Sequence, residues 1–265
     1  MRTAISQMKV KGLFLDYDGT IGPIKVARHE SLVPVETATI LCQIHRIIPV
    51  GIVTTKSLSF IVPRTPFASM WCGIAGLEMK MGDQVVEDPR VDVALTQMLS
   101  AIKKAEDLAR NNLYIEKKCD LKGRVLAFCI DWRNITDSFN AIKIAREIAT
   151  ECKSMNLWVI EYEQQPFFDV YPFETNKGIA LEESKLKLGI KHGIIYMGDS
   201  KVDNPAFEVA DLGIGVLHEE SVIGLECDYY IKFQDVATFL RRLLEENLVF
   251  HNDFPEITIE KFRRR

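Results

Sequence analysis

The sequence predicts an α/β fold in which an open, mainly parallel sheet is interrupted by an inserted α+β domain. Two observations predict this class. Short apolar runs end repeatedly in a polar residue or a carboxylate, which is typical of buried parallel strands. Between roughly residues 80 and 170 the pattern changes to longer helical periodicities mixed with strands, and the apolar runs resume afterwards. A chain of 265 residues is long enough for one large or two modest domains.

Five apolar runs are the expected strands of the parallel sheet. In open α/β sheets the ligand lies beyond the carboxyl ends of the strands, so the polar residues that end these runs are expected to converge in one cleft. The runs are 12–15, which ends at Asp16; 47–53, which ends at Thr54; 70–74; 193–197, which leads into Asp199; and 212–216.

The segment between these runs has a different pattern. A block of helices and strands of this size predicts a small α+β domain inserted into the larger one. The elements expected there are helices at 91–108 and 138–155 and strands at 125–130, 157–163 and 167–171, with a turn at 164–166. The predicted division is a core domain of residues 1–79 and 172–265 and an inserted domain of residues 80–171.

The composition excludes several classes of protein. The formal net charge of −4 gives no basis for nucleic-acid binding, and no apolar run has the length of a membrane span. The first residues lack the apolar stretch of a secretory signal, which favours a cytoplasmic location. The six cysteines include no close pair, so their spacing fits neither a zinc site nor a disulfide framework.

The most informative motif is Asp16-Tyr17-Asp18-Gly19-Thr20, directly after the first apolar run. Two carboxylates so close together at a strand end repel each other unless a cation lies between them. Mg²⁺ takes oxygen ligands and meets that need. The alternative is an Asp-Gly turn with solvated carboxylates. The apolar run before the motif and the Gly-Thr pair after it favour a site over a plain turn.

A second acidic motif, Gly198-Asp199-Ser200-Lys201-Val202-Asp203, follows the fourth apolar run. Asn204 and Pro205 have the pattern of a helix start, with Asn204 as the cap and Pro205 at the first position. That pattern puts Asp203 at the helix entrance, where capping is the alternative to metal binding. Asp199, at the strand end, is harder to assign to a structural role.

Two further residues complete the set. Thr54 offers a hydroxyl group and a backbone N–H to a phosphate, and its alternative is a helix cap. Lys177 begins a helix after the insertion and would neutralise charge on a phosphoryl group in the transition state. Its alternative is a solvated surface lysine. The acidic motifs that precede and follow these two residues in the sequence favour their assignment to the site.

These four pieces in this order resemble the haloacid dehalogenase superfamily, whose pattern is Asp-x-Asp after a strand, Thr or Ser after another, a lysine, and an acidic pair. The resemblance implies a Rossmann-like core with an inserted cap domain. It implies that Asp16 is a nucleophile that forms an aspartyl-phosphate. Asp18 would be the acid for the leaving oxygen and then the base for water. The implied phosphate-binding residues are Thr54 and Lys177, and the implied Mg²⁺ ligands are Asp16, the Asp18 backbone carbonyl, Asp199 and Asp203.

The residue two positions after the nucleophile narrows the chemistry. An acid at Asp18 serves to expel a poor leaving group such as a sugar alkoxide, which favours phosphomonoester hydrolysis or phosphomutase chemistry over ion pumping or dehalogenation. The insertion lies between Thr54 and Lys177, where the larger caps of this superfamily occur. Such a cap closes over a small substrate and excludes bulk water.

Several segments resemble the trehalose-6-phosphate phosphatase group. Residues 13–24 resemble its opening, 73–78 its Gly-x-His-Gly-x-Glu segment with Ala75 in place of histidine, 125–133 its cap strand, and 168–172 its Glu-Val-Arg-Pro strand. The departures fall on specificity positions and spare the catalytic ones. The resemblance implies sugar contacts by Glu78, Arg133 and Asp169. For Glu78 and Arg133 the alternative is a surface charge.

The expected function is Mg²⁺-dependent hydrolysis of a small phosphorylated sugar, with trehalose 6-phosphate among the candidates. One alternative is a sugar phosphomutase of the phosphomannomutase kind, although its second acidic motif usually has a longer, glycine-rich spacing. Another is a phosphatase for a different small metabolite such as a glycosyl-phosphoglycerate. A non-enzymatic binding protein would be expected to lack one of Asp16, Asp18, Lys177 or Asp199. The sequence does not indicate an oligomeric state.

Overall fold

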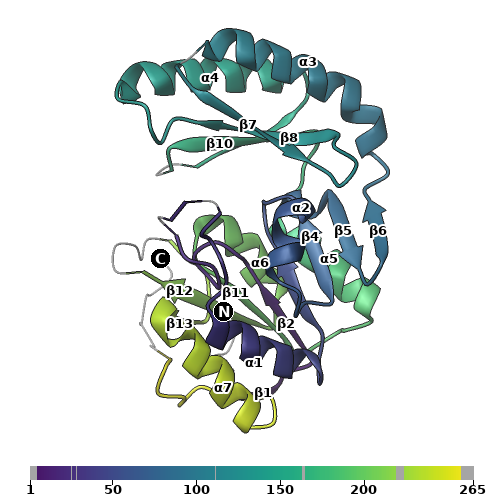
Figure 1. Ribbon diagram of the computed structural model, residues 1–265, viewed down its shortest axis with the longest axis vertical. Coiled ribbons are helices and arrows are strands. Elements are labelled where there is room, and N and C mark those ends of the chain that lie inside the picture. Colours follow the sequence, from purple (N-terminus) through teal and green to yellow (C-terminus); the bar gives the residue numbers. More distant parts are fainter. Residues whose placement is uncertain are drawn as a thin grey trace.

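The computed structural model describes residues 5–24, 26–27, 29–110, 112–162, 165–218 and 224–257. These residues form two α/β units stacked along the long axis of the molecule (Figure 1). The larger unit contains an eight-stranded sheet, and the smaller one contains a four-stranded sheet covered on its outer face by two helices. The predicted architecture of a parallel-sheet core with an inserted α+β cap is confirmed.

The large sheet has the order β13-β12-β11-β2-β3-β4-β5-β6. All pairs from β13 to β4 are parallel, as predicted, whereas β4, β5 and β6 pair antiparallel. The strands are β2 (Gly12–Leu15), β3 (Val50–Val53), β4 (Met70–Gly73), β5 (Glu78–Met81), β6 (Gln84–Glu87), β11 (Ile194–Gly198), β12 (Leu212–Leu217) and β13 (Tyr229–Lys232). The hairpin β5–β6 and the strand β13 were not predicted from the sequence.

Helices cover both faces of this sheet because its central strands are apolar on both sides. In β2, Leu13 and Leu15 pack into the cluster that includes the helices α1 and α7, whereas Phe14 packs into the cluster that includes α5 and α6. The helices of this unit are α1 (Val35–His45), α2 (Leu58–Ile61), α5 (Lys177–Leu188), α6 (Asn204–Val209) and α7 (Val236–Glu245). Two short strands, β1 (Gln7–Lys9) and β14 (Val249–His251), pair beside it. The resulting three layers leave the strand ends as the open edge.

The cap consists of an antiparallel sheet in the order β7-β8-β10-β9 with the helices α3 and α4 on its outer face (Figure 1). Its core is formed by apolar residues of both helices and of the sheet, among them Met98, Ala145 and Phe128. The elements are α3 (Val91–Ala109), β7 (Tyr114–Cys119), β8 (Val125–Asp131), α4 (Ser138–Ser154), β9 (Trp158–Glu161) and β10 (Phe167–Tyr171). The strand β7 was not predicted, and the turn predicted at 164–166 lies partly outside the described residues.

The secondary structure bears on two of the predicted boundaries. The division at residue 80 cuts through β5, which pairs with the large sheet together with β6. We therefore propose that the insertion begins after Glu87, and the return to the core at residue 172 stays a prediction. Asn204 is not the cap of α6 but its first residue, because a turn of 3-10 helix (Lys201–Asp203) precedes it. The Asn204 side chain bonds instead to the backbone of Gly224 and Glu226.

Within the described ranges, none of the helices combines the length and the apolar character needed to cross a lipid bilayer.

Candidate active site

The strand order brings three predicted residues to one edge of the large sheet. Asp199 follows β11, Asp16 follows β2 and Thr54 follows β3, and these strands are neighbours in the order β11-β2-β3. Because all three strands are parallel, their carboxyl ends lie on the same edge. Residues separated by more than 180 positions in the sequence therefore lie around one point. The cleft expected from the sequence is at this edge.

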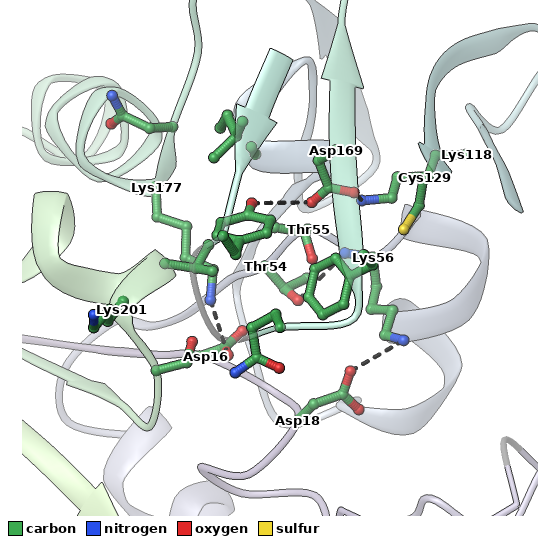
Figure 2. A pocket seen from close by; sticks show the side chains of 18 of the residues that line it. Asp16, Asp18, Thr54, Thr55, Lys56, Lys118, Cys129, Asp169, Lys177 and Lys201 are labelled. Carbon is green, nitrogen blue, oxygen red and sulfur yellow. Dashed lines mark hydrogen bonds and ion pairs between the residues drawn. The ribbon is translucent and has the colours of Figure 1, made fainter. Parts of the chain in front are cut away.

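Lys177 enters this cluster from the first turn of α5. Asn176 caps the helix, because its side chain accepts hydrogen bonds from the backbone N–H groups of Gly178 and Ile179. The Lys177 ammonium lies 2.8 Å from Asp16 Oδ2 (Figure 2). It also lies 2.7 Å from Asp203 Oδ1. Burial alone would lower the pKa of Lys177, but Asp16 and Asp203 outweigh it and raise that pKa. Lys177 is therefore a permanent positive charge, not a solvated side chain.

Asp203 organises the second acidic motif. Its Oδ1 accepts hydrogen bonds from Lys177 and from the hydroxyl group of Tyr196 at 2.6 Å. Its Oδ2 accepts from the backbone N–H groups of Asp199 and Ser200 and from the Ser200 hydroxyl, at 3.0–3.1 Å. Both oxygens are thus fully engaged within the protein. Asp203 fits the role of orienting Lys177 and the Asp199 loop better than that of a direct metal ligand.

The remaining carboxylates of the cluster carry a surplus of negative charge. Oxygen atoms of Asp16, Asp199 and Asp203 lie within 4.8 Å of one another. Asp16 Oδ1 is buried and has no hydrogen-bond partner among the described residues. Burial raises the pKa of Asp16, and burial together with Asp203 and Asp16 raises that of Asp199. An unpartnered oxygen beside a second, unneutralised carboxylate fits a hard divalent cation such as Mg²⁺.

Gly19 permits this close approach of the two acidic motifs. It has a φ of +73°, in the left-handed region, and a Cβ atom added there would lie 1.9 Å from Asp199 Oδ2. A side chain at this position would push the Asp199 carboxylate away from Asp16. The glycine of the Asp-x-Asp-Gly motif is therefore required both by the turn and by the packing against the second motif.

Asp18 and Thr54 lie at the same edge but outside the Lys177 cluster, by which we mean Lys177, Asp16 and Asp203. The Asp18 carboxylate pairs with the ammonium group of Lys56, at 3.1 Å between Oδ2 and Nζ (Figure 2). The Thr54 hydroxyl accepts a hydrogen bond from the Lys56 backbone N–H at 3.3 Å and can still donate to a ligand. The backbone N–H of Thr54 was expected to bind phosphate. It instead donates to Cys72 O at 3.0 Å, because this N–H continues the pairing of β3 with β4.

A pocket of about 1000 Å³ joins this edge to the cap. Its floor includes Asp16, Asp18, Thr54, Lys177 and Asp199, and its roof is the inner face of the cap sheet. The residues of the cap that line it are Glu116, Lys117, Lys118, Cys129, Arg133, Ile160, Glu161, Tyr162, Gln165, Pro166, Phe167, Asp169 and Tyr171. The catalytic candidates therefore share one pocket with residues of the inserted domain.

Asp169 lies in the roof of this pocket and is almost fully buried. Its Oδ1 pairs with the ammonium group of Lys118 at 2.6 Å, and its Oδ2 accepts from the hydroxyl groups of Tyr162 and Tyr171 at 3.1 and 3.3 Å. Burial would lower the pKa of Lys118, but the Asp169 charge outweighs it and raises that pKa. The roof thus presents a fixed group of polar donors and acceptors above the carboxylate cluster.

The two other predicted sugar contacts have different positions. Arg133 lines the pocket, but its guanidinium group is paired with Asp131 and lies 5.4 Å from the centre of the Phe167 ring. Glu78 is not among the described residues that line the pocket. Its Oε1 accepts a hydrogen bond from the backbone N–H of Leu121 at 2.9 Å, at the junction of the two units. We therefore correct the assignment of Glu78 from a substrate contact to a residue of that junction.

Sequence reasoning missed Lys56 and Lys118. Lys56 lies two residues after Thr54, in the loop that follows β3. Its distance from Thr54 in the sequence was the only signal that could have identified it. Lys118 belongs to β7, where alternation places Glu116 and Lys118 on the same face of the sheet. This alternation with a period of two could have predicted the strand, but half of its residues are charged, so it lacks the apolar alternation by which strands are usually recognised.

No family model and no curated protein matches the sequence, whereas solved structures do. One is a trehalose-6-phosphate phosphatase related protein, with a TM-score of 0.70 and 20% identity, covering 90% of this chain and 99% of that one. A second is the C-terminal domain of the C. albicans trehalose-6-phosphate phosphatase, with a TM-score of 0.73, 16% identity and coverages of 90% and 94%. A third is a haloacid dehalogenase-like hydrolase from Bacteroides thetaiotaomicron, with a TM-score of 0.67, 16% identity and coverages of 89% of this chain and 100% of that one.

These likenesses show the fold. The chain shares the fold of these proteins, a core with an inserted cap, over nearly its whole length, which confirms the fold that the resemblance of its motifs predicted. At such low identity they do not carry an activity or a substrate from one protein to another. Those conclusions depend on the residues of the site.

Proposed function

We propose that this protein is a Mg²⁺-dependent phosphomonoester hydrolase that acts on a small phosphorylated sugar through an aspartyl-phosphate on Asp16. One observation carries the proposal. At the floor of the pocket, Asp16 has one oxygen held by a buried lysine, and its other oxygen is buried without a hydrogen-bond partner among the described residues, beside the carboxylate of Asp199. This arrangement supplies a fixed nucleophile, a permanent cation for the phosphoryl oxygens and a position for a metal.

The first step joins an Asp16 carboxylate oxygen to phosphorus while the bond from phosphorus to the leaving oxygen breaks. Asp18 in its acid form gives its proton to that oxygen, so the products are the aspartyl-phosphate and a free alcohol. Lys177 neutralises charge on the phosphoryl oxygens throughout. In the second step Asp18 takes a proton from water, the water oxygen bonds to phosphorus, and the bond to Asp16 breaks.

Mg²⁺, when bound, would neutralise the phosphoryl oxygens and the carboxylates that face them. Asp16 Oδ1, Asp199 and the backbone carbonyl of Asp18 are the groups proposed to hold it. Asp203 would orient this set through Lys177 and the Asp199 backbone N–H. The Thr54 hydroxyl is proposed to donate a hydrogen bond to the phosphoryl group.

The polar roof supports a phosphorylated sugar as the substrate class. The Lys118 ammonium group keeps N–H donors beyond the one that it gives to Asp169, and the Tyr162 hydroxyl oxygen, whose hydrogen bonds to Asp169, can still accept. Donors and acceptors above the floor match the alternating character of sugar hydroxyl groups. Arg133 lines the same volume. Two of the similar solved structures are a trehalose-6-phosphate phosphatase and a related protein, which makes trehalose 6-phosphate a natural first substrate to test.

The proposal is tested by measuring inorganic phosphate released from a panel of phosphorylated sugars and from p-nitrophenyl phosphate, with Mg²⁺ and with chelator. We expect Mg²⁺-dependent release, and a loss of at least ~10³-fold in Asp16→Asn, whose side chain is nearly isosteric but cannot attack. A phosphomutase would isomerise a sugar phosphate without net release. A folded protein that binds phosphosugars and neither releases nor transfers phosphate would refute the enzymatic proposal.

A further inference from the structure

Lys56 contacts the proposed acid and base of the reaction, and the proposed function gives it no role. It follows β3 by three residues, lines the pocket and pairs with Asp18 at 3.1 Å (Figure 2). We infer that Lys56 is a positioning residue: its ammonium group holds the Asp18 carboxyl group apart from the Lys177 cluster, on the side from which the leaving group departs. This inference rests on the proposed phosphatase reaction.

The pairing of charges at the floor is selective. Lys177 pairs with Asp16 and Asp203, whereas Lys56 pairs with Asp18. Asp18 stands only two residues from Asp16, so without a cation of its own it would be drawn toward the ammonium group of Lys177. A carboxyl group in that position would neutralise the cation needed by the phosphoryl oxygens, and it would face the nucleophile instead of the leaving group.

Lys56 is itself held by three contacts, through its backbone N–H, its carbonyl oxygen and its ammonium group. Its backbone N–H donates to Thr54 Oγ1 at 3.3 Å, and its carbonyl oxygen accepts from the Ile74 N–H at 2.8 Å. Its ammonium group lies 5.6 Å from the centre of the Phe60 ring, which packs edge-on against Tyr17. The position of the ammonium group is therefore fixed by Ile74, directly after β4, and by the Phe60–Tyr17 pair, of which Tyr17 directly precedes Asp18 in the sequence.

The backbone of Asp18 is also fixed. The Gly19 N–H donates to Gly22 O at 2.8 Å, and Asp18 and Gly22 form an isolated bridge. The freedom that remains is rotation of the Asp18 side chain, which is 38% exposed. Without its cation, the Asp18 carboxylate would be free to rotate toward Lys177 or into water. The Lys56 ammonium group restricts this rotation, because it can donate a hydrogen bond to Asp18 Oδ2 whether the carboxyl group is ionised or protonated. A group that gives and takes protons contributes fully only when it is oriented.

A donor that protonates the leaving oxygen matters most when that oxygen is basic. Phenyl phosphate and p-nitrophenyl phosphate differ by one nitro group, but phenolate is far more basic than p-nitrophenolate. We expect Lys56→Met to lower kcat/KM for phenyl phosphate roughly 10- to 100-fold, in the range of a misplaced general acid. For p-nitrophenyl phosphate we expect a loss of no more than about 3-fold, because that leaving group needs little protonation. Lys56→Arg should restore most of the phenyl phosphate activity.

Two controls separate positioning from a structural role. Lys201→Met removes another pocket lysine and should change both substrates by the same factor. In an Asp18→Asn background, Lys56→Met should cause no further loss, because the group that it positions is already absent.

Equal losses of Lys56→Met on both phosphates, or a full additional loss in the Asp18→Asn background, would overturn the role of Lys56. A wild-type protein without any phosphate release would instead refute the proposed function itself.

Discussion

The described part of the chain contains two clusters of three carboxylates, and their difference separates a proposed metal site from a structural junction. In each cluster carboxylate oxygens lie within 4.8 Å of one another, and one buried oxygen has no hydrogen-bond partner in the described part of the chain. The first, which we call the floor cluster, consists of Asp16, Asp199 and Asp203 and lies at the strand ends. The second, which we call the junction cluster, consists of Glu78, Glu87 and Asp120 and lies where the large sheet meets the cap.

The two clusters differ in the cations that the protein supplies. In the junction cluster, the Arg124 guanidinium group bonds to Asp120 at 2.7 Å and to Glu87, and Lys122 pairs with Glu87 at 2.8 Å. In the floor cluster, Lys177 serves both Asp16 and Asp203, and Asp199 has no ion pair among the described residues. The number of acids therefore does not define a metal site. What defines it is negative charge that the protein leaves unneutralised.

The largest expected effect belongs to Asp199. Asp199→Asn removes a proposed ligand, so we expect Mg²⁺ affinity, measured by calorimetry, to fall by roughly 100-fold, at the upper end of losses for residues that support a metal. Phosphate release should then need correspondingly more Mg²⁺. The metal-free variant should melt at a higher temperature than wild type, because one of the mutually repelling buried carboxylates is gone.

Glu87→Gln is the matched control for this experiment, since it removes a carboxylate from the other cluster. It should leave the Mg²⁺ dependence unchanged. A wild-type Mg²⁺ affinity in Asp199→Asn would end the distinction between the two clusters.

The next effect concerns stability. Arg124→Met leaves the fully buried Asp120 and the mostly buried Glu87 without their main cation. Breaking a buried pair costs 3–5 kcal/mol, and the partial exposure of Arg124 reduces this, so we expect a loss of about 2 kcal/mol in urea unfolding.

Lys104→Met removes one partner of an exposed pair with Glu151 and should cost less than about 0.5 kcal/mol. A similar small cost for Arg124→Met would show that the junction does not depend on its cation.

The smallest effect is a pH dependence at Glu78. Burial, with Asp120 and Glu87 adding to it, raises the pKa of this carboxyl group. A carboxyl pKa that is higher in the folded state means that the unfolded chain loses its proton first as the pH rises, so wild-type stability falls above the ordinary glutamate range. Glu78→Gln keeps an acceptor for the Leu121 N–H and does not ionise. We expect its melting temperature to exceed that of wild type increasingly from pH 5 to pH 8. A constant difference across this range would contradict the raised pKa.

Much of the floor could be predicted because its signals are local. An apolar run followed by a carboxylate marks both Asp16 and Asp199, and the parallel topology then brings the strand ends together without further information. The long cap helices were predicted for the same reason, since α3 and α4 have sustained helical periodicity. Local patterns of this kind indicate the element and the residue at which it ends.

The remaining features depend on partners that no local pattern reveals. The strand β6 has two adjacent exposed valines, Val85 and Val86, and β7 is rich in charged residues that line the pocket, so neither shows the apolar alternation of a half-buried strand. Glu78 was assigned to the substrate from its segment, whereas its partner is a backbone N–H 43 residues away. The pairing of Lys56 with Asp18 joins two loops whose proximity follows only from the order of the strands.

The strand order also has a consequence for how the chain is made. β2 pairs with β3 on one side and with β11 on the other, and β11 begins at Ile194. During synthesis at roughly 5–20 residues per second, the second edge of β2 therefore stays without its partner for on the order of 10–40 s. In that interval the whole cap emerges first and can fold from contacts close in sequence. An apolar strand with an open edge is a template for wrong pairing, so the nascent chain is exposed to aggregation at the strand that ends at Asp16, the proposed nucleophile.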